Sequence, residues 1–321
     1  MNRSVAFEQK LLRTKNYELP TNLLWGVDLG GTKIEAAIID PTHPDIGLHR
    51  RRVPTERDQG YDHILQQIVK LIEELESLSG MKRPSKIGFG TPGVTDPATG
   101  ILKNSNTQCL NHRLLRDDLS RVLHTQALLA NDANCFALAE ATLGVARGKK
   151  VVMGLIIGTG IGGGLVVDGR IIEGLHGIAG EWGHNTLRGE EAPCYCGKKG
   201  CNERVFSGPA LEQFYFEQTG TKILLHDVVG LASIGEEAAQ KTLQRLQEKF
   251  SEAIAVPINI LDPDAIVIGG GVGNIDLLYT EETRQKIFHY VFNDEFKTPI
   301  LKPFLGDSAG VFGAALLTRL F

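Results

Sequence analysis

The feature that most constrains the fold of this chain is an order of strands, glycine-rich turns and helices that occurs twice along its 321 residues. The first occurrence begins with three short runs rich in β-branched residues and separated by Gly or Pro turns, as in a meander, at 23–28, 34–40 and 46–53. An amphipathic helix is predicted over 61–78, because apolar residues recur there every three or four positions and Gly80 follows. A strand at 87–89 completes this first set.

The same order begins again in the second part of the chain. Strands are predicted at 151–157, 163–167 and 170–172. A long helix over 240–260 then leads into a strand at 265–268. Strands that alternate with helices are typical of α/β proteins. We therefore expect two similar α/β halves, with the boundary between them near Ala130.

Charge and hydropathy exclude several classes of function. The 34 basic and 38 acidic residues give a net charge of -4, and no basic run stands out beyond His49 to Arg52. This balance argues against a nucleic acid or an anionic membrane as the partner. The segment from Met1 to Asn22 is polar, unlike a signal peptide, and no run of about 18 apolar residues predicts a membrane helix. We expect a cytoplasmic protein.

The first motif with chemical meaning is a glycine turn between two predicted strands, and its residues are Asp28, Gly30, Gly31, Thr32 and Lys33. Glycines let backbone N–H groups approach phosphate oxygens closely, and the Thr and Lys side chains add donors. No helix is predicted after the turn, so it is not a Walker loop. Taken alone, the motif fits equally well a tight hairpin whose glycines only satisfy the turn geometry.

A second glycine turn stands at the corresponding place in the other half and contains Gly158, Thr159 and Gly160. Two such hairpins facing each other would clamp a polyphosphate. A third glycine run follows a predicted strand and consists of Gly269, Gly270 and Gly271. It would let a flat adenine ring approach the backbone; the alternative is a turn that merely begins a helix.

Cysteine spacing points to a metal. The chain has five cysteines, and Cys194, Cys196 and Cys201 crowd into one short segment. An odd count with this crowding favours a metal site over a disulfide framework. Three free thiols in a mobile loop are the alternative, and such a cluster would be prone to oxidation.

In combination, these motifs resemble the ROK family (repressor, open reading frame, kinase) of sugar kinases from about Trp25 to the C-terminus. The most specific match is Glu181-Trp182-Gly183-His184 followed by the cysteine segment at 194–201. Within the family, the chain is most similar to bacterial fructokinases of the mannofructokinase type.

The resemblance implies an α/β fold of the actin-like and hexokinase-like ATPase type, with two similar domains around a central cleft. It also returns the closing helix at 310–321 to the first domain. The expected domains are therefore a small one, 1–130 with 307–321, and a large one, 131–306.

For the cysteine segment, the resemblance implies a zinc site beside the sugar pocket. His184 would join Cys194, Cys196 and Cys201, and these are the N and S ligands of structural tetrahedral Zn²⁺. Four protein ligands leave no open position for water, so the expected role is structural. The second ring nitrogen of His184 would contact a sugar hydroxyl.

Asp132 is the expected catalytic residue. It lies between a predicted strand and a helix running to about Leu143, where an Asp is usually a helix N-cap. The resemblance instead implies a general base that takes the proton from the attacking sugar hydroxyl. Asp28 would help to hold the Mg²⁺ that accompanies ATP.

Sugar hydroxyls need donors and acceptors from several directions. The resemblance assigns this part to Asn106, Asn131, Asp132, Glu181, His184 and Glu203, with Gly93 in a further wall. Considered singly, Asn106 or Glu203 would be read as a solvated loop residue.

The resulting hypothesis is an ATP-dependent hexose kinase, first of all a fructokinase with mannose or glucose as further substrates, that binds its hexose with MgATP as a homodimer. Cys109 stands where those fructokinases carry Trp, so the alternative is an N-acetylglucosamine kinase or a glucokinase of the same family. A sugar-responsive repressor is disfavoured, because only about 22 residues precede the first strand. A sugar-binding regulator without catalysis is disfavoured by Asp132 and the two glycine turns.

Overall fold

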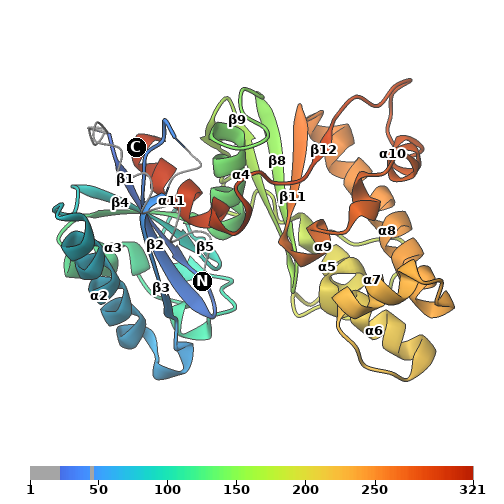
Figure 1. Cartoon of the computed structure of the whole chain (residues 1–321), viewed down its shortest axis with the longest axis horizontal. Helices are drawn as coiled ribbons and strands as arrows, with labels where there is room; N and C mark the ends of the chain where they lie inside the picture. Colours follow the sequence, from blue (N-terminus) through green and yellow to red (C-terminus); the bar gives the residue numbers. More distant parts are fainter. Residues whose placement is uncertain (1–21, 44–46, 321) are drawn as a thin grey trace. The chain divides into compact units, whose positions relative to one another are not determined.

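A computed structural model describes residues 22–43 and 47–320 of the chain (Figure 1). The polar N-terminal segment before Asn22, position 46 of the predicted third strand and the last residue of the predicted closing helix lie outside this range. The chain divides into two compact units: unit 1 runs up to Asp132 and resumes at Gly310, and unit 2 is Ala133–Ala309. Among the described helices, none combines the length and the apolar character that a membrane crossing requires.

Unit 1 is built on a five-stranded sheet in the order β3-β2-β1-β4-β7. The strands are β1 (Leu24–Leu29), β2 (Lys33–Ile39), β3 (Gly47–Pro54), β4 (Lys86–Thr91) and β7 (Gln126–Asn131). The first three form the predicted antiparallel meander, whereas β4 and β7 run parallel to β1. A small second sheet pairs β5 (Val94–Thr95) with β6 (Leu102–Lys103).

Helices α2 (Tyr61–Ser79), α3 (Leu115–Leu123) and α11 (Ala309–Leu320) complete unit 1. The prediction of α2 is confirmed: Ile64, Ile68 and Leu71 are fully buried in the core that includes the strands, and Gly80 ends the helix with a positive φ. Helix α11 approaches the backbone of the sheet directly. A Cβ at Gly88 of β4 would lie 1.7 Å from the carbonyl oxygen of Ala314.

Replacing Gly88 with Ala is therefore expected to lower the free energy of unfolding by about 1–3 kcal/mol or more, because α11 must move off the sheet. Chemical denaturation measures the loss. Gly230→Ala is the matched control, since nothing lies within 4 Å of a Cβ at that position. Equal unfolding midpoints for the two variants would contradict the close packing of α11.

Unit 2 repeats the strand arrangement of unit 1, in the order β10-β9-β8-β11-β12. The strands are β8 (Val151–Ile157), β9 (Ile161–Val167), β10 (Arg170–Ile171), β11 (Ala265–Gly269) and β12 (Ile300–Leu301). Three antiparallel strands are again followed by two parallel ones, which confirms the repeat read from the sequence. β9 starts earlier than predicted, because Gly162 pairs with β8 although the glycine run indicated only a turn.

Helix α4 (Asp132–Thr142) begins at Asp132 of unit 1 and continues into unit 2. The other helices of unit 2 are α5 (Asn202–Phe206), α6 (Gly208–Thr219), α7 (Leu225–Ser233), α8 (Glu237–Leu261), α9 (Gly270–Gly273) and α10 (Glu281–Phe288). The long helix α8 packs against α5, α6, α7 and α10, and Figure 1 shows α5 to α8 gathered beside β11. Aromatic rings of Trp182, Phe206 and Phe250 fill the core between them.

Candidate active site

In unit 1, candidate side chains follow the carboxyl ends of neighbouring parallel strands. Asp28 of β1 is in register with Gly90 of β4, and Thr91 of β4 with Asn131 of β7. Ligands of open α/β sheets bind beyond this edge. Asp132, the first residue of α4, follows Asn131 directly. The sheet topology of unit 1 therefore brings the predicted base and the predicted Mg²⁺ residue to one edge.

The carboxyl group of Asp28 has an unusual pKa, raised to about 7. Burial is the main cause, and the negative charges of Asp132 and Glu35 add to it, while Lys33 and Arg52 act in the opposite direction. Two carboxylates that lie close together repel each other when both are charged. A divalent cation such as Mg²⁺, which prefers oxygen ligands, removes this repulsion and stabilises their charged forms. The donor set at Asp28 thus fits the predicted Mg²⁺.

The first glycine turn lies beside Asn106. A Cβ on Gly31 would be 3.7 Å from Asn106 Oδ1 and 3.9 Å from Nη1 of Arg57. Arg57, on the short helix Arg57–Gln59, was not a candidate from the sequence, since a single arginine in a polar loop carries no motif. Thr32 and Lys33 are exposed, and the tight hairpin of the alternative interpretation is present in the Gly30 N–H bond to Lys33 O, 2.9 Å long. Gly93 accepts a bond from Asn131 Nδ2 at 3.3 Å.

In unit 2, the second and third glycine turns meet. A Cβ on Gly158 would lie 3.9 Å from the backbone nitrogen of Gly271, and Gly158 O accepts a bond of 2.8 Å from Gly208 N. Gly270 begins α9 with a φ of 83°, so the third turn does begin a helix, as the alternative interpretation held. The backbone of Gly271 at the same time faces the second turn.

A pocket of about 1350 Å³ opens beside these two turns. It is lined by Gly158, Thr159 and Gly271, and by side chains of α6, α7, α8 and the segment 274–286. The size is sufficient for a nucleotide. The glycines and the helix at 240–260 could be predicted from the sequence, whereas α6 and α7 could not, because they carry no motif.

Two of the predicted sugar residues, Glu203 and Glu181, lie in or next to helices of unit 2. Glu203, on α5, accepts a 2.9 Å bond from Ile161 N at the end of the second glycine turn, so one of its carboxylate oxygens supports that turn. Glu181 directly precedes the short helix Trp182–His184, which is anchored by the Trp182 Nε1 bond to Ala253 O. Gly160 and Glu203 are neighbours, since a Cβ on Gly160 would meet Glu203 Oε2 at 2.6 Å.

The predicted metal ligands come together. The ligand atoms of His184, Cys194, Cys196 and Cys201 all lie within 4.8 Å of one another. Cys194 Sγ is 3.6 Å from His184 Nδ1, and Cys196 Sγ is 3.5 Å from Cys201 Sγ. These separations match the edges, about 3.5–3.8 Å, of a tetrahedron with Zn–N near 2.0 Å and Zn–S near 2.3 Å. The donor set and its spacing fit a structural Zn²⁺.

The second nitrogen of the His184 ring has a partner that sequence analysis missed. Nε2 lies 3.0 Å from the hydroxyl of Tyr195, the residue between the first two cysteines. Because Nδ1 faces Cys194, Nε2 carries the proton when Nδ1 binds a metal. The tyrosine thus stands where the resemblance places a sugar hydroxyl.

Comparisons with known proteins find relatives of one family over nearly the whole chain. A profile of the ROK family matches residues 24–320. The N-acetyl-D-glucosamine kinase of Photobacterium profundum is 36% identical over 305 residues, which are 92% of this chain and 99% of the relative. The enzyme of the same name from Vibrio cholerae serotype O1 is 34% identical, with 92% and 99% covered.

Solved structures give the same result. The ROK hexokinase from Thermus thermophilus is 31% identical, with a TM-score of 0.80 over 93% of this chain and 98% of the other. A ROK family glucokinase from Streptomyces griseus, in complex with glucose and AMPPNP, is 25% identical, with a TM-score of 0.77 over 94% and 100%. A ROK family transcriptional regulator at 24% identity and a TM-score of 0.78 shares the fold over 92% of this chain.

Proposed function

This chain belongs to the ROK family and has the hexokinase-like α/β fold that its sequence predicts, and on that premise we propose that it is an ATP-dependent sugar kinase. The observation that carries the proposal is the conjunction, within unit 1, of a strand-end Asp132 with the partly buried Asp28. A regulator has no need of a carboxyl group whose pKa is raised by burial and by a second carboxylate beside it.

In the proposed reaction, Asp132 accepts the proton of the sugar hydroxyl as that oxygen attacks the γ-phosphorus, and the bond from the γ-phosphorus to the bridging oxygen breaks, so that ADP leaves. Asp28 would hold Mg²⁺, which neutralises charge on the phosphates. The backbone N–H groups of the glycine turns at Gly30, Gly158 and Gly271 would position the phosphate oxygens. Asn106, Asn131, Glu181, His184 and Glu203 are proposed to bind the sugar, with Gly93 in a wall of its pocket.

For the sugar, we favour N-acetylglucosamine over the fructose that the sequence first suggested. Curated relatives at 34–36% identity over 92% of this chain are N-acetyl-D-glucosamine kinases. Cys109 supports the change: its Sγ lies 3.7 Å from Arg57 O, beside the Asn106 segment, where the fructokinases carry a larger indole. A thiol takes up less volume than an indole, which favours a sugar with a bulkier substituent.

A panel of sugars at fixed MgATP tests both parts of the proposal. We expect kcat/KM for N-acetylglucosamine to exceed that for glucose, mannose and fructose by about tenfold or more, since one or two altered hydrogen bonds or one steric conflict suffice for that ratio. Fructose at the head of the ranking would restore the fructokinase hypothesis. No ADP release with any of the four sugars would reject the kinase proposal in favour of a regulator.

A further inference from the structure

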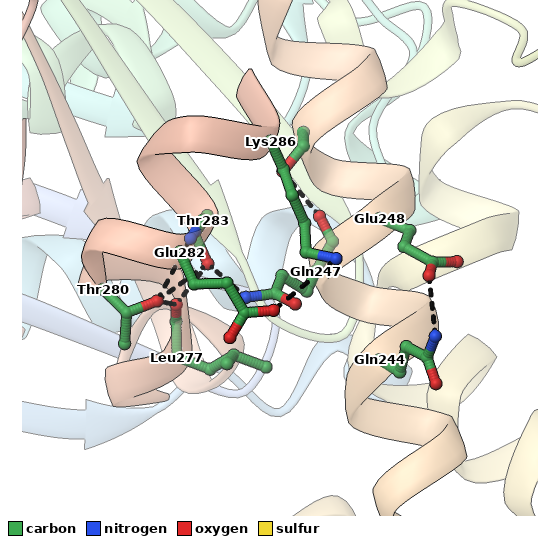
Figure 2. Close-up of polar contacts among 9 residues, drawn as sticks. Gln244, Gln247, Glu248, Leu277, Thr280, Glu282, Thr283 and Lys286 are labelled. Carbon is green, nitrogen blue, oxygen red and sulfur yellow. Dashed lines mark hydrogen bonds and ion pairs between the residues drawn. The ribbon is translucent and has the colours of Figure 1, made fainter. Parts of the chain in front are cut away.

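The pocket of unit 2 contains a buried amide whose orientation is fixed by its neighbours. Gln247 of α8 is 3% exposed and lines the pocket, and its Nε2 lies 2.9 Å from Oγ1 of Thr283 on α10. Thr283 is fully buried. Figure 2 shows the Gln247 amide directed toward this hydroxyl.

The hydroxyl of Thr283 decides which amide atom faces it. Thr283 Oγ1 donates its hydrogen to the carbonyl oxygen of Leu277 at 2.6 Å, so toward Gln247 it can only accept. Thr280 Oγ1 lies 3.1 Å from Thr283 Oγ1 and accepts from Thr283 N at 3.2 Å, and these contacts hold the start of α10 in place. The Gln247 nitrogen therefore points to Thr283, and its Oε1 points elsewhere.

Oε1 of Gln247 is left as an acceptor. Among the residues that the structure describes, none donates a hydrogen bond to it, and it is not one of the fully buried atoms without a partner, so water reaches it in the free protein. A ligand that displaces this water without offering an N–H or O–H group leaves the amide oxygen unpaired, which is costly. The amide therefore favours a ligand that brings a donor to this point.

The walls around the amide limit which group that is. Phosphate oxygens only accept hydrogen bonds, so the phosphates of a nucleotide cannot satisfy Oε1. The lining is mixed: Leu225, Val229, Leu243, Val272, Ile275 and Leu277 are apolar, whereas Gln240, Gln244, Asn274, Asp276, Glu282 and Lys286 are polar. The apolar residues suit a flat heteroaromatic ring, and the polar ones offer partners for the ribose hydroxyls.

We propose that Gln247 is a specificity-determining residue: its Oε1 accepts a hydrogen bond from the 6-amino group of adenine, and Thr283 holds it in that orientation. The inference rests on the proposed kinase function and adds the basis of donor selection. A 6-oxopurine presents an oxygen at the same position, and two acceptors facing each other leave both unpaired. The pocket thereby selects adenine over hypoxanthine nucleotides.

Calorimetric titration of the full chain with ADP and with IDP, in Mg²⁺ and without sugar, tests the inference. The two ligands differ in the group at position 6 and in the proton on the adjacent ring nitrogen. We expect ADP to bind at least about tenfold more tightly than IDP. Gln247→Leu should weaken ADP binding by about tenfold and bring the ratio of the two dissociation constants close to one.

Three further variants test whether the orientation of the Gln247 amide, and not merely the packing around it, determines the preference for ADP. Thr283→Val removes the acceptor that fixes the amide, so the amide can turn its nitrogen to the pocket and the preference for ADP should fall. Thr283→Ser keeps the hydroxyl and should keep the preference. Gln213→Leu, on α6 outside the pocket and bonded to Glu217, is the matched control and should change neither constant. Thermal unfolding checks that each variant is folded.

Failure of the Gln247 proposal and failure of the proposed kinase function would give different results. A chain that binds neither nucleotide and turns over no sugar would reject the kinase proposal itself. ADP and IDP constants that are equal in the parent, or a ratio unchanged in Gln247→Leu, would overturn only the role of Gln247. A variant that loses ADP and IDP equally, together with weak binding of 2′-deoxy-ADP to the parent, would assign the amide to the ribose and overturn the adenine contact.

Discussion

Asp132→Asn is expected to lower kcat by about 10²- to 10⁴-fold while the fold and sugar binding are retained. The amide has nearly the same shape, and it can occupy the same position at the start of α4, but it cannot take a proton from the attacking hydroxyl. Turnover is followed by coupled ADP release, and sugar binding by calorimetry on the same preparation.

Asp117→Asn is the matched control for this substitution. Asp117 lies in the first turn of α3 with a side chain 67% exposed, so its loss should leave kcat unchanged. Turnover of Asp132→Asn within about tenfold of the parent would reject the assignment of the base, because general bases contribute more than that. Loss of both turnover and cooperative unfolding would instead mean that the fold itself needs the Asp132 carboxylate, because Asn caps a helix as well as Asp does.

Features encoded within a short segment could be predicted from the sequence. The meanders, α2 and the metal ligands each depend on spacing over a few residues. The cysteine cluster needs only the turn at Gly197 and Gly200, both with positive φ, to bring Cys201 back to Cys194 and Cys196. The duplicated strand order could also be predicted, because each half of the chain repeats the same local pattern of strands and turns.

Features that depend on contacts between distant segments could not be predicted from the sequence. Gln247 and Thr283 are 36 positions apart, and neither belongs to a motif, so the orientation of the amide appears only when α8 and α10 pack together. The same holds for Arg57, which lies near Gly31 through the return of the chain after β3. The sequence predicts a sugar contact for Glu203 but not its bond to Ile161 N, because 42 positions separate the two residues.

The second large effect is expected at the metal site, where Cys196→Ser should reduce bound zinc well below one ion per chain. Zinc in such sites is held by thiolates and imidazole, and removing one of four ligands opens the shell. Cys196 lies 3.5 Å from Cys201, so its loss also weakens the position of a second ligand. Metal analysis after dialysis against a weak chelator measures the change. Lys199→Ser, an exposed residue of the same segment whose side chain pairs with Glu191, is the control and should keep its zinc.

Loss of zinc should appear mainly in the affinity for the sugar. Without the ion, the His184 ring loses the metal bond at Nδ1 and is held only by its contacts with Cys194 and Tyr195, so its Nε2 is a less firmly oriented donor for a sugar hydroxyl. The segment after Cys201 carries Glu203, which supports the second glycine turn through Ile161 N. Because α5 itself, and not the ion, holds that carboxylate, ADP affinity should fall much less than sugar affinity. A metal-free preparation with an unaltered sugar KM would reduce the cluster to a fold feature, and equal losses of sugar and ADP binding would mean that zinc stabilises unit 2 as a whole.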